Sequence, residues 1–470
     1  MRAASPNPPC RKDDTVARAP TLLPEGPLWR TFLLFLIPMI AANVLQALSG
    51  TINNVYLGQM IGVDALAAVS AFFPILFLFI SFIIGLGAGA SVLIGQAFGA
   101  QKFDEVKRVA GTTLAVAILF GLLVAAFGGL FTGRILALVG TPADILPSAT
   151  GYARIMLIAM PGLFVFLLFT AMMRGVGDTV TPLYALALST AVGLAVTPML
   201  IRGSFGLPKL GVEIGAVASI LSFLLALVWL AWFLRRRRHP LAPDAVLLRG
   251  LVIDRAILVA VLKIGLPSGV QLILVSLSEV AVLALVNSFG SQATAAYGTV
   301  NQVVSYVQFP AISIAITASI LGAQAIGAGR ADRLGQITRT GLVLTLVISG
   351  TLVLLAYLFS RRIIGFFITD PAVIELAQRL LHITLWSYIV FGLAAVVAGV
   401  MRASGTVLVP TAIAIIAIVG IEVPVAYALA PRVGIDGVWI AYPVAFAAML
   451  AMQSAYYWFV WRKKPIKRLI

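Results

Sequence analysis

The sequence has little charge and very few of the residues that build metal or redox sites. Only 11% of its 470 residues are Asp, Glu, Lys or Arg, whereas soluble domains carry about 25%. The single cysteine, Cys10, excludes an internal disulfide and a cysteine-bound metal. Two histidines, His239 and His382, are too few and too far apart in the chain for a histidine metal site. We therefore expect no metal centre and no cofactor.

Motifs for enzymatic chemistry are missing as well. The sequence contains no glycine-rich phosphate loop, no Ser-His-Asp arrangement and no ATP-binding domain. An integral membrane transferase would need a clustered catalytic set, so this class is the least favoured alternative. We expect a protein that is not an enzyme and that draws energy from an ion gradient or from the gradient of its own substrate.

Long apolar runs make up most of the chain. Hydrophobic residues account for 61% of it, and about 20 mostly apolar residues suffice for a helix to span a bilayer. Six runs precede a basic stretch at 235–238 and six follow it. They lie near residues 30–57, 64–96, 109–133, 149–173, 181–203, 212–234, 257–288, 293–325, 339–359, 377–401, 408–430 and 436–461. The pattern predicts an all-α polytopic membrane protein with twelve transmembrane helices.

The two sets of six runs are copies of one unit. At a constant offset of 228 residues, segment 173–182 matches 401–410 and segment 96–100 matches 324–328. Six helices per copy is an even number, so both copies enter the membrane from the same side and are parallel repeats. We predict two six-helix bundles related by pseudo-two-fold symmetry around a central cleft.

The distribution of lysine and arginine predicts the orientation. These residues concentrate in cytoplasmic connections, and most of the 33 in this chain share one side if both termini lie there. The net charge of +16 therefore reflects membrane topology and not nucleic-acid binding. We expect a bacterial-type inner (plasma) membrane protein with both termini cytoplasmic. The predicted parts are a disordered cytoplasmic tail (1–29), an N-terminal bundle (30–234), a cytoplasmic linker (235–256), a C-terminal bundle (257–462) and a basic cytoplasmic tail (463–470).

Two carboxylates fall deep inside apolar runs of the second half, Glu279 and Glu422. An ionisable group at membrane depth costs about 2.5–3.5 kcal/mol or more, so its presence suggests a function. The alternative is a neutralised carboxylate that is retained for helix packing. We take both residues as ion-coupling candidates.

Polar side chains recur along the first helix and along the first two helices of the second half, where a cleft would be lined. In membrane helices such residues can also serve only as interhelical hydrogen-bond partners. The residues predicted to line a polar cavity are Asn43, Gln46, Asn53, Asn54, Gln271, Ser278, Asn301, Gln302, Ser305 and Tyr306. By contrast, the repeated segments around Arg174, Arg402, Gln96 and Gln324 read as hinges at cytoplasmic turns.

Several segments together resemble one transporter family. They are Asn-Val-Leu-Gln at 43–46, Asp-Ala-Leu-Ala-Ala-Val-Ser at 64–70, Gly-Gln-Ala-Phe-Gly at 95–99, Met-Arg-Gly-Val-Gly-Asp-Thr at 173–179 and Thr-Pro-Met-Leu-Ile at 197–201. Over residues 30–460 the chain resembles the multidrug and toxic compound extrusion (MATE) family. The resemblance implies a V-shaped pair of bundles in a monomer. It also implies secondary active export of organic, often cationic amphipathic compounds by alternating access, in antiport with protons or sodium.

The chain departs from the family pattern at the expected ion site. Many members carry an aspartate where this chain has Asn53, and one branch carries another where it has Thr197. A further branch uses a glutamate at the position of Val275, and Glu279 lies one helical turn beyond it. Since residues four apart share a helix face, we expect Glu279 to take over that role, including any sodium binding.

A lipid-linked sugar or polyisoprenoid flippase of the same wider superfamily is the main alternative. Such proteins often have strongly cationic clefts. The apolar runs here carry no Arg or Lys near their middle, which disfavours the flippase. A channel or scramblase would not need a buried carboxylate and should be indifferent to Glu279→Gln.

Overall fold

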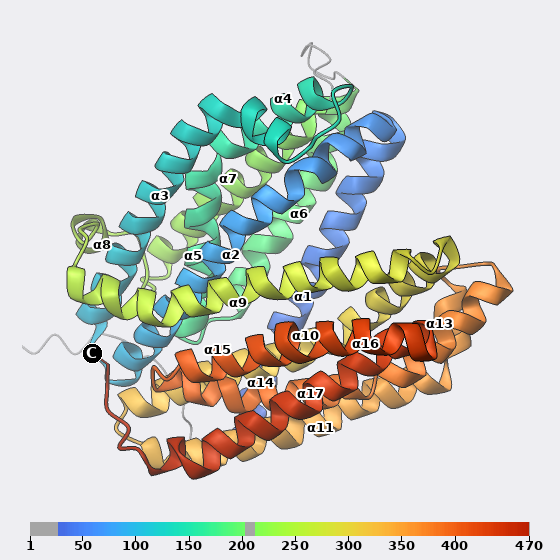
Figure 1. The fold of residues 1–470 in the computed structure, drawn as a ribbon. Coiled ribbons are helices and arrows are strands. Elements are labelled where there is room, and N and C mark those ends of the chain that lie inside the picture. Colours follow the sequence, from blue (N-terminus) through green and yellow to red (C-terminus); the bar gives the residue numbers. More distant parts are fainter. Residues whose placement is uncertain (1–26, 203–211, 470) are drawn as a thin grey trace, which may run out of the picture.

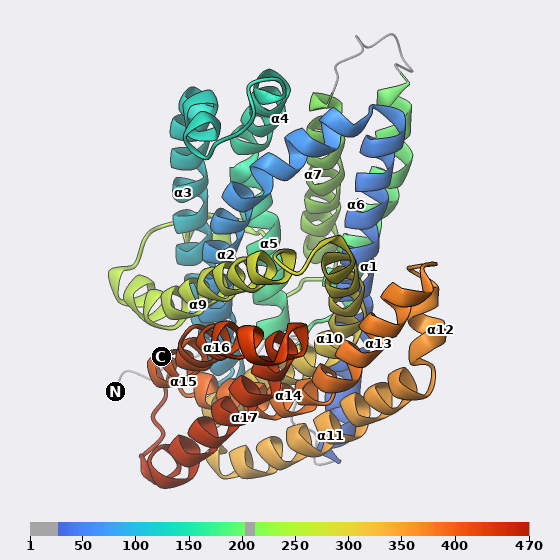
Figure 2. The same cartoon turned by 45° about the vertical axis from the view of Figure 1, so that its right-hand side comes forward.

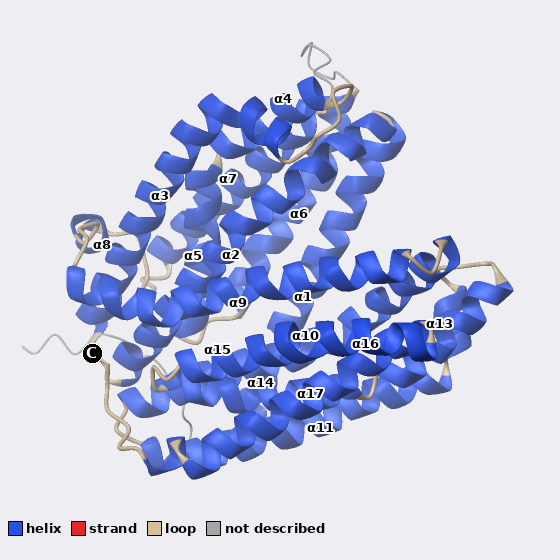
Figure 3. Ribbon diagram, viewed as in Figure 1, coloured by secondary structure: helices blue, strands red, loops and turns tan. Residues whose placement is uncertain are grey.

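A computed structural model describes residues 27–202 and 212–469. The predicted tail at 1–29 therefore lies almost wholly outside the described residues. Within the described ranges the chain forms helices joined by short loops, and no strand occurs there (Figure 3). The all-α prediction is confirmed.

The N-terminal bundle contains the first seven helices. They are α1 (Leu28–Met60), α2 (Val63–Gly99), α3 (Phe103–Leu138), α4 (Leu146–Ile158), α5 (Met160–Gly175), α6 (Val180–Ile201) and α7 (Glu213–Arg236). The axes of α4 and α5 meet at a bend of 54°. Pro161 lies in the first turn of α5, where its missing N–H costs no helical hydrogen bond. These two helices together form one broken span.

A short helix, α8 (Ala245–Arg249), lies in the linker, and the C-terminal bundle follows. Its helices are α9 (Arg255–Asn287), α10 (Ser291–Gly327), α11 (Leu334–Leu358), α12 (Ser360–Gly365), α13 (Pro371–Thr384), α14 (Ser387–Ala403), α15 (Leu408–Ile415), α16 (Val423–Val433) and α17 (Ile435–Phe459). A π-helical turn, η3 (Ile416–Glu422), joins α15 to α16. In the described part, eleven helices are long and apolar enough to cross a membrane, and the bent pair brings the number to twelve.

The repeat is visible in the turns as well as in the helices. Both second helices of the two copies begin after a glycine with positive φ, which is 127° at Gly62 and 98° at Gly290. Only glycine adopts such a conformation without strain. The two residues are related by the 228-residue offset, so the same turn is built twice.

The two bundles meet at one end and diverge from it (Figures 1 and 2). α2 of the first bundle packs against α9 and α10 of the second. We call this the basic end, because the α2–α3 turn with Lys102, the 235–256 linker and the basic residues 462–468 gather there. The arrangement confirms two six-span bundles in a V shape.

A reciprocal contact joins the bundles at the basic end. Gln96 Nε2 donates to the carbonyl oxygen of Ala403 at 2.8 Å, and Gln324 Nε2 donates to the carbonyl oxygen of Gly175 at 3.0 Å. The 228-residue offset relates the two donors and also the two acceptors. We call this contact the glutamine seam. The segments expected to be hinges thus also hold the two bundles together.

The carboxyl-terminal tail makes the seam asymmetric. The backbone N–H of Leu469 donates to Gln96 Oε1 at 2.8 Å. The equivalent atom of the other copy, Gln324 Oε1, is buried and has no hydrogen-bond partner in the described structure.

Candidate functional site

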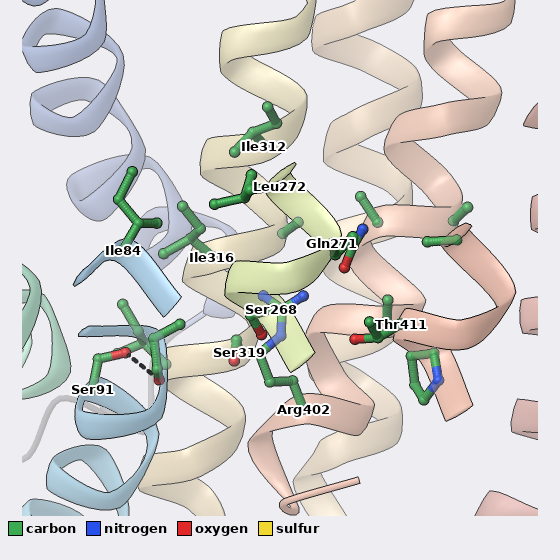
Figure 4. Close-up of a pocket in the computed structure, with 18 of the residues that line it drawn as sticks. Ile84, Ser91, Ser268, Gln271, Leu272, Ile312, Ile316, Ser319, Arg402 and Thr411 are labelled. Atoms are coloured by element: carbon green, nitrogen blue, oxygen red, sulfur yellow. Dashed lines mark hydrogen bonds between the residues drawn. The ribbon is translucent and has the colours of Figure 1, made fainter. Parts of the chain in front are cut away.

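A cavity of about 290 Å³ lies between the bundles. Its wall comes from α2 and α5 of the first bundle and from α9, α10, α14, α15 and α17 of the second. Most of that wall is apolar, and Figure 4 shows Ile84, Leu272, Ile312 and Ile316 around it. A mostly apolar cavity with a few polar groups is the usual form of a site for an organic ligand.

The wall of the cavity is itself built from the repeat. Five pairs of lining residues are related by the 228-residue offset: Ile84 and Ile312, Gly87 and Ala315, Ala88 and Ile316, Ser91 and Ser319, and Arg174 and Arg402. The cavity therefore lies at the pseudo-two-fold axis, where duplicated residues from both bundles meet.

Among the residues that the structure describes, Arg174 and Arg402 are the only charged ones in this wall. They lie in the last turns of α5 and α14. Figure 4 shows Arg402 beside Ser268 and Ser319. Assigning the two arginines only to cytoplasmic turns was incomplete, because both also face the cavity. Long side chains of a helix point back toward its N-terminus, so an arginine at a helix end reaches inward from the turn. The sequence signal was the same Met-Arg pair in both copies.

A second pocket of about 280 Å³ lies within the N-terminal bundle. Gln46, Asn53 and Thr197 line it, together with serines and apolar side chains, and no charged residue of the described part of the chain does. Asn53 and Thr197 are the positions at which the resemblance implied aspartates. The pocket expected for ion binding in this bundle is thus polar but neutral.

The two candidate carboxylates come together in the C-terminal bundle. Glu279 lies on α9 and Glu422 lies at the end of η3, and α9 packs against η3. Glu422 is 3% exposed, whereas Glu279 is exposed at the surface. The hydroxyls of Tyr297 and Tyr442 are 3.5 Å apart.

The π-helical turn is the local cause of the position of Glu422. Such turns widen a helix by one residue and often occur at functional sites. Pro424 follows immediately in the first turn of α16, and its ring removes one backbone donor. The equivalent helix of the first copy, α6, has no π-helical turn.

The remaining residues predicted to line a cavity lie in several places. Gln271 lines the central cavity, and Asn43 Nδ2 donates across the bundles to Ser313 Oγ at 3.3 Å. Ser278 donates to the Leu274 carbonyl of its own helix. Asn54 is exposed.

The polar stripe of α10 is held together by contacts within the helix. Ser305 Oγ donates to the carbonyl oxygen of Asn301 at 2.8 Å, and Gln302 Nε2 donates to the hydroxyl of Tyr306 at 3.4 Å. Gln302 and Tyr306 are exposed. None of these four residues lines the central cavity.

Comparison with known proteins identifies the family. The family model MatE matches the chain twice, at residues 38–199 and 267–428. The chain belongs to the MATE family. The two matches cover most of the two bundles, so the family model recognises the same internal repeat. This MATE protein is therefore a multi-pass membrane transporter and not an enzyme.

Relatives and solved structures agree with this assignment. The chain is 48% identical to "Probable multidrug resistance protein YoeA" of Bacillus subtilis over 94% of this chain and 96% of that protein. It is 26% identical to "Probable multidrug resistance protein NorM" of Thermotoga maritima, over 86% of each. The crystal structure of the Vibrio cholerae MATE transporter VcmN in its bent form has the same fold. It has a TM-score of 0.83 at 22% identity and covers 91% of this chain and 96% of that one.

Proposed function

We propose that this MATE transporter is a secondary active multidrug exporter that works by alternating access, in antiport with protons or sodium ions. The central cavity lies between two bundles that meet at the basic end and diverge from it (Figure 1), and this arrangement supports alternating access. The names of the relatives, which describe multidrug resistance, support export of organic compounds.

The observation that carries the coupling is the packing of α9, which carries Glu279, against η3, which ends at Glu422. Two carboxylates that lie close together repel each other when both are charged. Binding a proton or a sodium ion relieves that repulsion, so the pair has a physical reason to bind one cation. Neither residue lines the central cavity, which leaves the cavity free for the substrate.

The substrate expected from the resemblance is an organic, often cationic amphipathic compound. The apolar wall of the cavity supports the amphipathic part of that expectation. The guanidinium groups of Arg174 and Arg402 do not support the cationic part, because like charges repel.

Transport in vesicles, with pH and sodium gradients imposed separately, tests the coupling. A panel of anionic, neutral and cationic amphipathic dyes makes the assay independent of substrate charge. We expect Glu279→Gln and Glu422→Gln each to reduce gradient-driven export at least about tenfold. Glu375→Gln, at an exposed carboxylate of the same bundle, is the matched control and should export normally. Full gradient-driven export by Glu279→Gln would rule out coupling at this residue.

We also propose that the basic end faces the cytoplasm of a bacterial-type inner membrane and that the protein acts as a monomer. Cationic connections remain on the cytoplasmic side. A cysteine in the 235–256 linker should then react only with reagents applied from inside, and labelling from outside would reverse the orientation.

A flippase for lipid-linked sugars or polyisoprenoids is the second candidate. The sequence argued against it because no cation appeared near the middle of an apolar run. The structure removes that argument, since two arginines line the cavity.

A further inference from the structure

The central cavity contains two positive charges that no acidic residue compensates. Arg174 and Arg402 line it, and within residues 27–202 and 212–469 no Asp or Glu does. Among the described residues, neither guanidinium takes part in any ion pair. Asp178, four residues after Arg174, accepts hydrogen bonds from its own turn, with Thr181 N at 2.9 Å and Val180 N at 3.1 Å.

An uncompensated guanidinium in the mostly apolar central cavity raises the free energy of the protein. Arginine stays charged at every relevant pH, and a buried charge is normally paired. The two unpaired guanidinium groups in the cavity therefore lack a counter-ion, which a bound anion would supply. Each presents several N–H donors in a planar fork that fits a carboxylate or a phosphate.

Three other polar groups of the cavity already donate to carbonyls of the protein. The hydroxyl of Ser91 donates to the Ala88 carbonyl at 3.2 Å, and that of Ser268 donates to the Ile264 carbonyl at 3.0 Å. The amide of Gln453 donates to the Pro410 carbonyl at 2.8 Å. The remaining polar side chains of the wall, Gln271, Ser319 and Thr411, are neutral, so the two guanidinium groups determine which ligand charge the cavity favours.

We propose that the central cavity binds the anionic group of an amphipathic organic compound, a carboxylate or a phosphate, through Arg174 and Arg402. The apolar part of the compound packs on the Ile84, Leu272, Ile312 and Ile316 wall. This assignment rests on the proposed export function and gives it a substrate class. It also separates the two charges of the transport cycle, with the anion held between the bundles and the coupling cation held near Glu279 and Glu422.

Three fluorescent probes with one apolar body test the proposal: pyrenebutyrate, pyrenebutanol and pyrenebutyl trimethylammonium. Their binding to the purified full-length protein in an uncharged detergent is measured by fluorescence polarisation. We expect pyrenebutyrate to bind about tenfold or more tightly than the other two. Arg174→Gln and Arg402→Gln should each weaken its binding about tenfold and leave pyrenebutanol unchanged.

Two further variants serve as controls, one that keeps the positive charge in the cavity and one that removes an arginine outside it. Arg402→Lys keeps the charge and should retain part of the preference for pyrenebutyrate. Arg249→Gln removes an exposed arginine of α8 outside the cavity and should change nothing. Equal binding of all three probes to the wild type, or unchanged pyrenebutyrate binding in both glutamine variants, would overturn the proposal.

Competition distinguishes the two sources of such an anion. Displacement of pyrenebutyrate by dodecyl phosphate supports a soluble amphipathic anion, whereas displacement only by phosphatidylglycerol in mixed micelles supports a lipid headgroup. Failure of both to displace it would contradict an anion site. The binding assay uses no gradient, so a protein that binds pyrenebutyrate but shows no coupled export refutes the proposed function and leaves the anion site standing.

Discussion

The N-terminal bundle has a neutral polar pocket, whereas the C-terminal bundle carries Glu279 on α9 and Glu422 at the end of η3. The 228-residue offset places Leu194, a residue of the neutral pocket, at the position of Glu422. At the glutamine seam the same offset relates the two identical donors, Gln96 and Gln324, and two small acceptor residues, Gly175 and Ala403. The two copies have therefore diverged where ions would bind and have stayed alike where the bundles touch.

Steric limits explain why the two copies have remained similar at the seam. A Cβ atom added to Gly99 would lie 2.1 Å from the backbone oxygen of Gln324, and one added to Gly327 would lie 1.9 Å from that of Gln96. Backbone atoms cannot move aside as a flexible side chain can. A polar pocket, by contrast, can exchange one side chain for another of similar size at small cost.

The largest effect is expected from adding a Cβ atom to either of these two glycines. Gly99→Ala and Gly327→Ala should each disfavour the closed basic end by about 2–3 kcal/mol, which is a roughly 30- to 150-fold shift in the equilibrium. Spin labels at Lys102→Cys and Arg330→Cys, in a Cys10→Ser background, would report a wider separation. Because an added Cβ meets a backbone oxygen at nearly the same distance in both copies, the two variants should behave alike.

Gly350→Ala is the control for this prediction, since nothing lies within 4 Å of an added Cβ there. It should leave the label separation unchanged. A shift in only one of the two seam variants would show that the bundles do not close symmetrically.

A smaller effect should reveal the asymmetry that the tail introduces. Gln96 makes two hydrogen bonds across the seam region, whereas Gln324 makes one and leaves its oxygen unpaired. At about 1 kcal/mol per bond, Gln96→Ala should cost about 2 kcal/mol in thermal unfolding and Gln324→Ala about 1 kcal/mol or less. Removing residues 464–469 should make the two losses equal. Equal losses in the full-length chain would contradict the role of Leu469.

The smallest effect concerns the linker, which packs on α3 of the N-terminal bundle. Burial alone would raise the pKa of Asp244, but hydrogen bonds from Lys107 and the Leu247 N–H outweigh it and lower the pKa. Backbone N–H groups of Ile257 and Ala256, together with Arg108, likewise lower the pKa of Asp254. Groups with a lowered pKa stabilise the fold above their unfolded pKa, and this stabilisation is lost as the pH falls through the folded value.

Acid should therefore loosen the linker from the N-terminal bundle. Hydrogen exchange in residues 244–254, corrected for its intrinsic pH dependence, should quicken below the ordinary pKa of aspartate, about 3.9. The Lys107–Asp244 side chains are 19% and 41% exposed, so the pair contributes about 1 kcal/mol or less. Asp244→Asn should abolish much of the pH dependence, whereas Asp332→Asn in the other bundle should not.

Much of the fold follows from the sequence, because apolar runs, basic connections and the repeat each reflect one strong physical constraint. The twelve spans and the two bundles come directly from them. The bend between α4 and α5 is harder to foresee, since Pro161 marks a helix start as readily as a kink.

The candidate site was only partly predictable. Glu279 and Glu422 stand out individually as carboxylates in apolar runs, yet their proximity depends on the packing of α9 against η3. Arg174 and Arg402 were read as cytoplasmic because helix-end arginines usually obey the positive-inside rule. That rule places the helix end at the cytoplasmic side, but it does not account for the long side chain, which points back toward the helix N-terminus and reaches the cavity.

The bond from the Leu469 N–H to Gln96 Oε1 has a kinetic consequence. Leu469 belongs to the tail that follows the C-terminal bundle, whereas Gln96 belongs to the N-terminal bundle. The hydrogen bond therefore forms only while the two bundles lie together at the basic end. Under alternating access each turnover must break it, which adds to the activation barrier for opening toward that end. Changes in residues 464–469 should therefore alter the turnover rate, while the choice of substrate stays with the cavity.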